Sequence, residues 1–137
     1  MLGRVKVLFG FLADAANQTT DGKLNVLGVF ATIGAPSFPA TRPLAHVVVR
    51  VELSSPELGG KYPIKLIQLD EDGIEVSRLE ADFTPHLGPN VAPTLNGVAD
   101  LIFPVQIPMP KAGSYHFSVM MQGEEKARVP FSAILVS

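Results

Sequence analysis

Hydrophobic and polar residues alternate along most of the chain with a period of two residues. In the segment Ala45–Leu53 the odd positions are all apolar, whereas the even positions include Arg50 and Glu52. The segments Tyr115–Met121 and Ala127–Leu135 show the same alternation. Successive side chains of a strand lie on opposite faces of its sheet, so the pattern predicts strands with one apolar and one polar face. No segment has a sustained period of 3.6 residues, and therefore no helix is expected.

Turn-forming residues divide the chain into eight expected strands. Twelve glycines and twelve prolines interrupt the apolar segments, and Gly22, Gly73 and Gly123 tolerate the positive φ that tight turns require. The expected strands are Val5–Ala13, Leu24–Ile33, Leu44–Leu53, Tyr62–Leu69, Glu75–Phe83, Val98–Val105, Ser114–Gln122 and Ala127–Val136. Strands with a single apolar face bury it when two sheets stack. The pattern thus predicts one all-β domain over residues 1–137, an antiparallel two-sheet β-sandwich of about eight strands, immunoglobulin-like or Greek-key.

Three irregular connections favour the sandwich over the alternative, a closed barrel. The proline-rich connection Ala35–Pro43 is expected to be extended and to cross one end of the sandwich. Ser54–Lys61 is expected to be a surface turn region, and Thr84–Thr94 is the longest irregular loop. Because proline donates no hydrogen bond to a ladder, the strands around Pro63 and Pro130 are expected to be edges or to carry bulges.

Composition narrows the functional classes. The chain has 137 residues, enough for a core, and no cysteine, which excludes disulfides, thiolate metal sites and cysteine catalysis. A cysteine-free chain suits a reducing compartment, so a cytoplasmic location is expected. The net charge of −2 offers no basic surface for nucleic acid, and the apolar runs are too short to span a membrane.

The first fourteen residues combine two basic residues, an apolar run and small residues near Ala13. A secretory signal has the same ingredients, but here Arg4 and Lys6 are interleaved with valines and Gly10 interrupts a short apolar stretch. The segment is therefore interpreted as the first strand.

The order of turn and core motifs resembles an uncharacterised bacterial family of small immunoglobulin-like β-sandwich proteins, a domain of unknown function. The motifs that carry the resemblance are Phe11–Asp14, Gly22–Gly28, Phe38–Ala40, Pro43–Ala45, Asp70–Gly73, Gly113–Phe117 and Gly123–Phe131. They extend over nearly the whole chain. The resemblance implies a bacterial source and a sandwich fold, and it transfers no catalytic residue and no cofactor.

Metal-binding residues are considered first among the candidates for chemistry. His46, His86 and His116 have no ligand spacing, so scattered surface histidines are expected. The acidic segment Asp70–Gly73 lacks the later oxygen ligands of a calcium loop, because Ile74 begins the next strand at once. It is interpreted as a tight turn.

Catalytic candidates are equally sparse. Asp14 follows an apolar strand and is expected to cap backbone donors in the next turn. No serine lies in a Gly-x-Ser-x-Gly motif. An enzyme would require Asp14 and His46, His86 or His116 to meet in one pocket. Neither a catalytic residue nor a cofactor is expected.

Apolar side chains on outward-facing strand positions give the best functional hypothesis. Such a half-apolar face, together with the long loop, indicates a surface for a partner protein or a second copy. The residues predicted to contact the partner are Val48, Arg50, His86, Leu87, Met120 and Ile134. The sequence thus predicts a non-enzymatic protein-binding or self-assembly module. The alternative is a small-ligand or carbohydrate-binding sandwich, although sugar sites favour exposed aromatic rings and this chain has no tryptophan and two tyrosines, Tyr62 and Tyr115.

Overall fold

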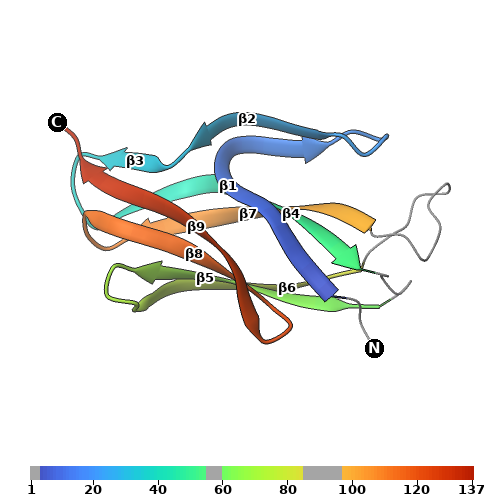
Figure 1. The fold of residues 1–137 in the computed structure, drawn as a ribbon. Helices are drawn as coiled ribbons and strands as arrows, with labels where there is room; N and C mark the ends of the chain where they lie inside the picture. Colours follow the sequence, from blue (N-terminus) through green and yellow to red (C-terminus); the bar gives the residue numbers. More distant parts are fainter. Residues whose placement is uncertain (1–3, 55–59, 85–96) are drawn as a thin grey trace.

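The computed structural model describes residues 4–54, 60–84 and 97–137, which form nine strands and no helix (Figure 1). In chain order they are β1 (Arg4–Gln18), β2 (Leu24–Phe30), β3 (Thr32–Ala35), β4 (Ala40–Ser54), β5 (Tyr62–Asp70), β6 (Glu75–Phe83), β7 (Gly97–Met109), β8 (Gly113–Met121) and β9 (Glu124–Leu135). Most of the expected turn region at 54–61 and of the loop at 84–94 lies outside the described residues. No helix in the described part of the chain could cross a membrane.

The strands form two stacked sheets, which confirms the predicted β-sandwich. One sheet has the order β2-β1-β4-β7, and the other has the order β3-β9-β8-β5-β6. Every paired neighbour is antiparallel except β3 and β9, which run parallel from Thr32 beside Ser132 to Ala35 beside Leu135. Parallel pairing therefore joins the first third of the chain to its last strand, an arrangement that the antiparallel prediction did not include.

The expected strand Leu24–Ile33 is two strands that belong to different sheets. β2 ends at Phe30 in the four-stranded sheet, and β3 begins at Thr32 in the five-stranded sheet. The change of sheet occurs at Ala31, whose carbonyl accepts a hydrogen bond from the Ser132 N–H at 2.9 Å. The largely apolar segment from Val29 to Ile33 contains neither a glycine nor a proline, so the pattern alone merged the two strands into one.

β7 and β4 are longer than expected because proline is tolerated where a strand has a partner on one side only. β7 pairs only with β4 and continues through Pro104 and Pro108 to Met109. β4 in turn begins at Ala40, inside the expected proline-rich connection, with a register shift between Arg42 and Ala45. At the edge of a sheet the missing proline N–H leaves no ladder bond unmade.

Pro63 and Pro130 were expected to lie in strands that are edges or carry bulges. β5 and β9 are interior strands, but the ladder of β5 with β6 shifts register between Gln68 and Leu69, and the ladder of β8 with β9 shifts register between Val119 and Met120. Each proline nevertheless lies where pairing on one side is absent. Pro63 pairs with Asp82 on β6 but precedes the first residue of β5 that pairs with β8. Pro130 pairs with His116 on β8 but precedes the start of the β3 ladder. The edge alternative was therefore wrong for both strands, whereas the bulge alternative agrees with the register shifts in their ladders.

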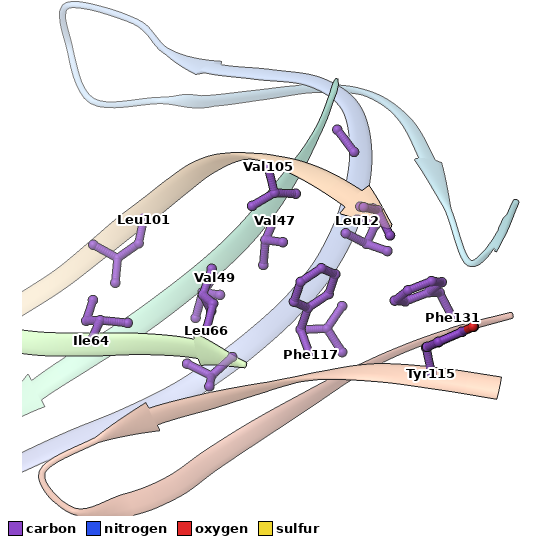
Figure 2. Close-up of a cluster of buried hydrophobic side chains, with 14 of the residues drawn as sticks. Leu12, Val47, Val49, Ile64, Leu66, Leu101, Val105, Tyr115, Phe117 and Phe131 are labelled. Carbon is purple, nitrogen blue, oxygen red and sulfur yellow. The ribbon is translucent and has the colours of Figure 1, made fainter. Parts of the chain in front are cut away.

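The core lies between the two sheets, where the predicted inward positions meet (Figure 2). Val47 and Val49 of β4 pack toward Leu66 of β5 and Phe117 of β8, and all four side chains are at most 2% exposed. Phe131 stacks on Phe117, with ring centroids 5.7 Å apart. The inward positions predicted for Val47, Val49, Phe117 and Phe131 are thus confirmed.

One polar side chain bridges the two sheets inside this core. Gln68 of β5 is fully buried, and its amide nitrogen donates a hydrogen bond of 2.8 Å to the carbonyl of Pro108 on β7. Its amide oxygen accepts a hydrogen bond of 2.8 Å from the Ser77 hydroxyl of β6. A buried amide is tolerated where such bonds are made, so Gln68 joins three strands across the sandwich.

Candidate interaction surface

Backbone hydrogen bonds hold the turn that joins β1 to β2. The Thr19 N–H donates to the Lys23 carbonyl at 2.8 Å, and the Gly22 N–H donates to the Thr19 carbonyl at 3.0 Å. Gly22 has φ +85°, which glycine adopts without strain. The Thr19 hydroxyl donates to the Asp21 carboxylate, and this bond, followed by the contact with Lys23, lowers the pKa of Asp21. These contacts fix the turn at the tip of the hairpin.

The root of the hairpin is held by a cluster around Asp14. The Asp14 carboxylate forms an ion pair with Arg42 of β4, and the Arg42 guanidinium lies 4.4 Å from the centroid of the Phe30 ring. A ring nitrogen of His46 lies 3.1 Å from the Asp14 carbonyl oxygen. Gly28 has φ +70°, and a Cβ there would overlap the Asp14 carboxylate. Asp14 therefore pairs with Arg42 within a strand instead of capping a turn, which corrects the expectation from the sequence.

Beyond this root the hairpin separates from the rest of its sheet. The pairing of β1 with β4 ends at Ala13, whereas its pairing with β2 continues to Gln18. Figure 1 shows β1 bending after its first half and running onward with β2 alone. In the described part of the chain no strand pairs with the other side of β2, which leaves one edge of this strand open.

Two large apolar side chains project from the open strand. Leu27 is 72% exposed and Val29 is 62% exposed. They lie opposite Ala15 and Ala13 of β1 and therefore share one face of the hairpin. We call the β2 edge together with Leu27 and Val29 the hairpin edge.

The other three sheet edges carry the features that prevent edge-to-edge pairing. β7 contains Pro104 and Pro108, and β3 has four residues and is followed by Pro36. The edge strand β6 carries four charged side chains, which are Glu75, Arg78, Glu80 and Asp82. β2 has seven residues and contains neither a proline nor a charged residue. Among the described edges it is the one that lacks these protections.

Val48 does not contribute to an exposed surface, contrary to expectation. It points to the outer side of the four-stranded sheet, but its side chain is 0% exposed. Phe11 of β1 lies beside it in register, and Ile102 of β7 lies beside it on the other side. Large neighbours on both flanking strands therefore cover it.

Arg50 is engaged within the molecule. Its Nε and Nη2 atoms donate to the two carboxylate oxygens of Asp100 at 2.6 and 3.0 Å. Its guanidinium also lies 5.1 Å from the centroid of the Phe9 ring. The hydrogen bond to Asp100 raises the pKa of Arg50 above its usual value. A bidentate pair of this kind fixes Arg50 on the sheet face.

The remaining predicted contact residues lie elsewhere. Met120 and Ile134 belong to β8 and β9 of the five-stranded sheet, so they are on the opposite sheet from Val48 and Arg50. Ile134 is 44% exposed, in agreement with its predicted position on the surface. His86 and Leu87 lie outside the described residues. The four described residues of the predicted contact therefore lie on two different sheets.

Met120 lines an apolar recess of about 260 Å³ at the end of β5 and β8. Tyr62, Pro63, Lys65 and Met121 form most of its wall. The Tyr62 side chain is 1% exposed, and its hydroxyl has no hydrogen-bond partner among the described residues. Methionine and proline side chains suit a small apolar molecule.

Those residues considered for catalysis or metal binding that the structure describes lie in two different sheets. His46 lies on β4 and His116 on β8, which belong to different sheets. Asp14 meets His46 only through its main-chain oxygen. No group of three metal-ligating side chains occurs among residues 4–54, 60–84 and 97–137. The acidic segment is the expected tight turn, since the Asp70 carboxylate accepts the N–H groups of Asp72 and Ile74 at 2.9 Å.

Leu27 and Val29 were not among the residues predicted from the sequence. Both were placed in the long expected strand Leu24–Ile33, where an apolar residue reads as core. A signal was present, because Leu24 and Val26 occupy one face of this strand while Leu27 and Val29 occupy the other. A strand that is apolar on both faces either lies between two layers or leaves one apolar face exposed.

The comparisons with known proteins point to a family rather than to an activity. The model of a family described as a family of unknown function, DUF6941, matches residues 8–134. A search of curated proteins found no match.

Proposed function

The chain belongs to the DUF6941 family, whose function is unknown, and from this premise we propose that it is a non-enzymatic protein-binding module. The observation that carries the proposal is the hairpin edge, where Leu27 and Val29 are exposed beside an open strand. Single exposed apolar residues are common on protein surfaces. An exposed apolar pair on a strand with unpaired backbone groups is the arrangement that binds another strand.

The contacts that the candidate catalytic groups make within the molecule support the non-enzymatic part of the proposal. The Asp14 carboxylate is paired with Arg42, and a ring nitrogen of His46 lies 3.1 Å from the Asp14 carbonyl oxygen. His116 lies in the other sheet, with its Nε2 atom buried. Among the described residues, Asp14 and His46 in one sheet and His116 in the other therefore do not form a single site.

We also propose that the sandwich is immunoglobulin-like. In an immunoglobulin sandwich one sheet contains strands A, B and E in that order, and the other contains G, F and C. β1, β4 and β7 follow the first order, and β9, β8 and β5 follow the second. β2 and β3 are then an insertion after the first strand, which extends it into a hairpin and connects it to the opposite sheet.

The bacterial source and the cytoplasmic location belong to the same proposal. The first rests on the resemblance described above, and the second is supported by the absence of cysteine. The partner is proposed to be a protein and neither nucleic acid nor membrane, since the net charge of −2 gives no excess of basic residues.

Small-ligand binding is the second candidate function, and the recess beside Met120 favours it. Carbohydrate binding has less support. Tyr62 and Tyr115 are 1% and 3% exposed, so neither offers a ring face on which a sugar could stack. The recess, about 260 Å³, is smaller than the usual ligand pocket of roughly 300 Å³ or more, whereas Leu27 and Val29 of the hairpin edge are 72% and 62% exposed.

Affinity capture with a matched pair of variants tests protein binding. Val29 is 62% exposed on the hairpin edge, and Ile74 is 61% exposed in the turn between β5 and β6. The tagged full chain and the Ile74→Lys control are expected to retain the same proteins from cells of the native host. Val29→Lys should lose them, because a charge would have to be buried at the contact. Identical retention by all three proteins would contradict the proposal.

A further inference from the structure

We propose that the partner of the hairpin edge is a second copy of the same chain, bound by antiparallel pairing of β2 with the second copy's β2. This inference rests on the proposed protein-binding function and names its partner. The two four-stranded sheets would join into one continuous sheet across a twofold axis.

The open side of β2 supplies the bonding groups. In a paired strand, half of the backbone N–H and C=O groups point away from the existing partner. On β2 these groups face away from β1 on either side of Gly28, whose φ of +70° departs from the extended backbone, and no strand among the described residues pairs with them. Since the hairpin extends beyond the end of the β1–β4 ladder, its outer side is accessible to another strand (Figure 1).

The composition of β2 favours a copy of itself. The strand Leu24–Phe30 contains no charged residue, so antiparallel self-pairing brings no like charges together. Lys23 lies just before the strand and would face the second copy's Ala31, which is uncharged. Like charges directly opposite one another destabilise paired strands, and this arrangement contains none.

The length of β2 fixes the register. When a strand of seven residues pairs with itself along its full length, its middle residue lies on the twofold axis. The middle residue of Leu24–Phe30 is Leu27, which is also its most exposed large apolar side chain. Leu27 then contacts the second copy's Leu27, and Val29 faces the second copy's Asn25. Full-length pairing therefore buries the exposed leucine of each copy against the other.

Light scattering after size exclusion measures the association on the purified full chain. The unmodified protein and the Ile74→Lys control are expected to be dimers at high concentration and to dissociate on dilution. Leu27→Lys should be a monomer at every concentration, because two lysines would meet on the axis. A cooperative unfolding transition of Leu27→Lys, at the temperature of the unmodified protein diluted to its monomer, would show that the variant is folded.

Crosslinking tests the register. The chain has no cysteine, so Leu27→Cys introduces a single thiol into each copy. Directly opposite residues of paired strands have Cβ atoms about 4.5–5.5 Å apart, close to the separation that a disulfide needs. With oxidised glutathione as the oxidant, Leu27→Cys is expected to form a covalent dimer, and Ile74→Cys is expected to remain monomeric.

The outcomes separate this inference from the proposed function. A dimer that persists in Leu27→Lys, or Leu27→Cys that crosslinks no faster than Ile74→Cys, would overturn pairing through β2. An unmodified protein that stays monomeric would overturn the second copy as partner. If Val29→Lys still lost captured proteins in that case, protein binding would stand with a different partner. If capture were also unaffected, both proposals would fail.

Discussion

At the scale of single residues, alternation predicts which side of a strand a side chain occupies but not how deeply it is buried. Val47 and Val49 point inward as predicted and are fully buried. Val48 points outward as predicted and is also fully buried, because Phe11 and Ile102 on the flanking strands cover it. Burial on the outer face depends on neighbours that lie far away in the sequence. The local pattern therefore could not distinguish Val48 from the exposed Val29.

Gln68 gives a prediction at this scale. Replacing it by leucine removes the hydrogen bonds to the Pro108 carbonyl and the Ser77 hydroxyl, and leaves both groups inside the sandwich without their partner. An unsatisfied buried polar group costs roughly 1–3 kcal/mol, so the free energy of unfolding in urea should fall by about that amount. The same substitution at the exposed Gln106 is expected to change it by less than about 0.5 kcal/mol. Equal effects at the two positions would exclude the bridging role of Gln68.

At the scale of elements, turn signals located most strands, but they did not show where a strand changes sheets. The turn at Gly22 separates β1 from β2 as expected. Nothing comparable marks Ala31, where the chain leaves one sheet for the other. The extension of β1 beyond Ala13 also depends on a tertiary contact, because Asp14 is held in the strand by Arg42 of β4. A polar residue after an apolar run reads as a strand end until such a partner is known.

Gly28 and Gly22 give a matched pair of predictions for the hairpin. Both have positive φ, so alanine at either position introduces backbone strain of roughly 1–2 kcal/mol. Nothing lies within 4 Å of a Cβ at Gly22, whereas a Cβ at Gly28 would overlap the Asp14 carboxylate. Gly28→Ala should therefore destabilise the protein more than Gly22→Ala.

Hydrogen exchange locates the effect. Amide exchange in Leu24–Phe30 is expected to accelerate in Gly28→Ala, because displaced Asp14 loses its contact with Arg42. Exchange in β8, which lies in the other sheet, should remain unchanged. Equal stability losses for the two glycine variants would show that the Asp14 cluster does not fix the hairpin.

At the scale of the whole molecule, the two-layer architecture follows from the sequence, but the order in which the strands pair within each layer does not. One apolar face on each strand requires two stacked sheets, and this is what the structure has. The neighbours of each strand are chosen by contacts between distant segments, such as β1 with β4 and β3 with β9. The functional surface depends on the same choice, because β2 is exposed only by its place at the end of the strand order. Fold class was therefore predictable, and the hairpin edge was not.

The stability of the whole molecule is expected to fall in acid. Hydrogen bonds from Thr19, Arg78 and Arg128 hold the pKa values of Asp21, Glu75 and Glu125 below their ordinary values of about 3.9 for aspartate and 4.3 for glutamate. A depressed carboxyl pKa stabilises the folded state above the unfolded pKa, and this contribution is lost as pH falls through the folded value.

The melting temperature should therefore be flat near neutral pH and decline below about pH 4, by a modest amount because the three groups are exposed. Glu125→Gln removes one of these groups and should make the decline shallower. A melting temperature that rises on acidification would refute this account.

The parallel pair of β3 and β9 has a consequence for synthesis on the ribosome. Residues 32–35 emerge early, but their partner, residues 124–135, emerges only after about ninety further residues have been translated. Until then β3 has no strand to pair with, and β8 has no neighbour on the side where β9 will pair. Contacts that join such distant segments form slowly, because a long loop must be closed before they can contribute. The nascent chain thus carries unpaired strand edges through most of its translation, a period in which other chains compete for them.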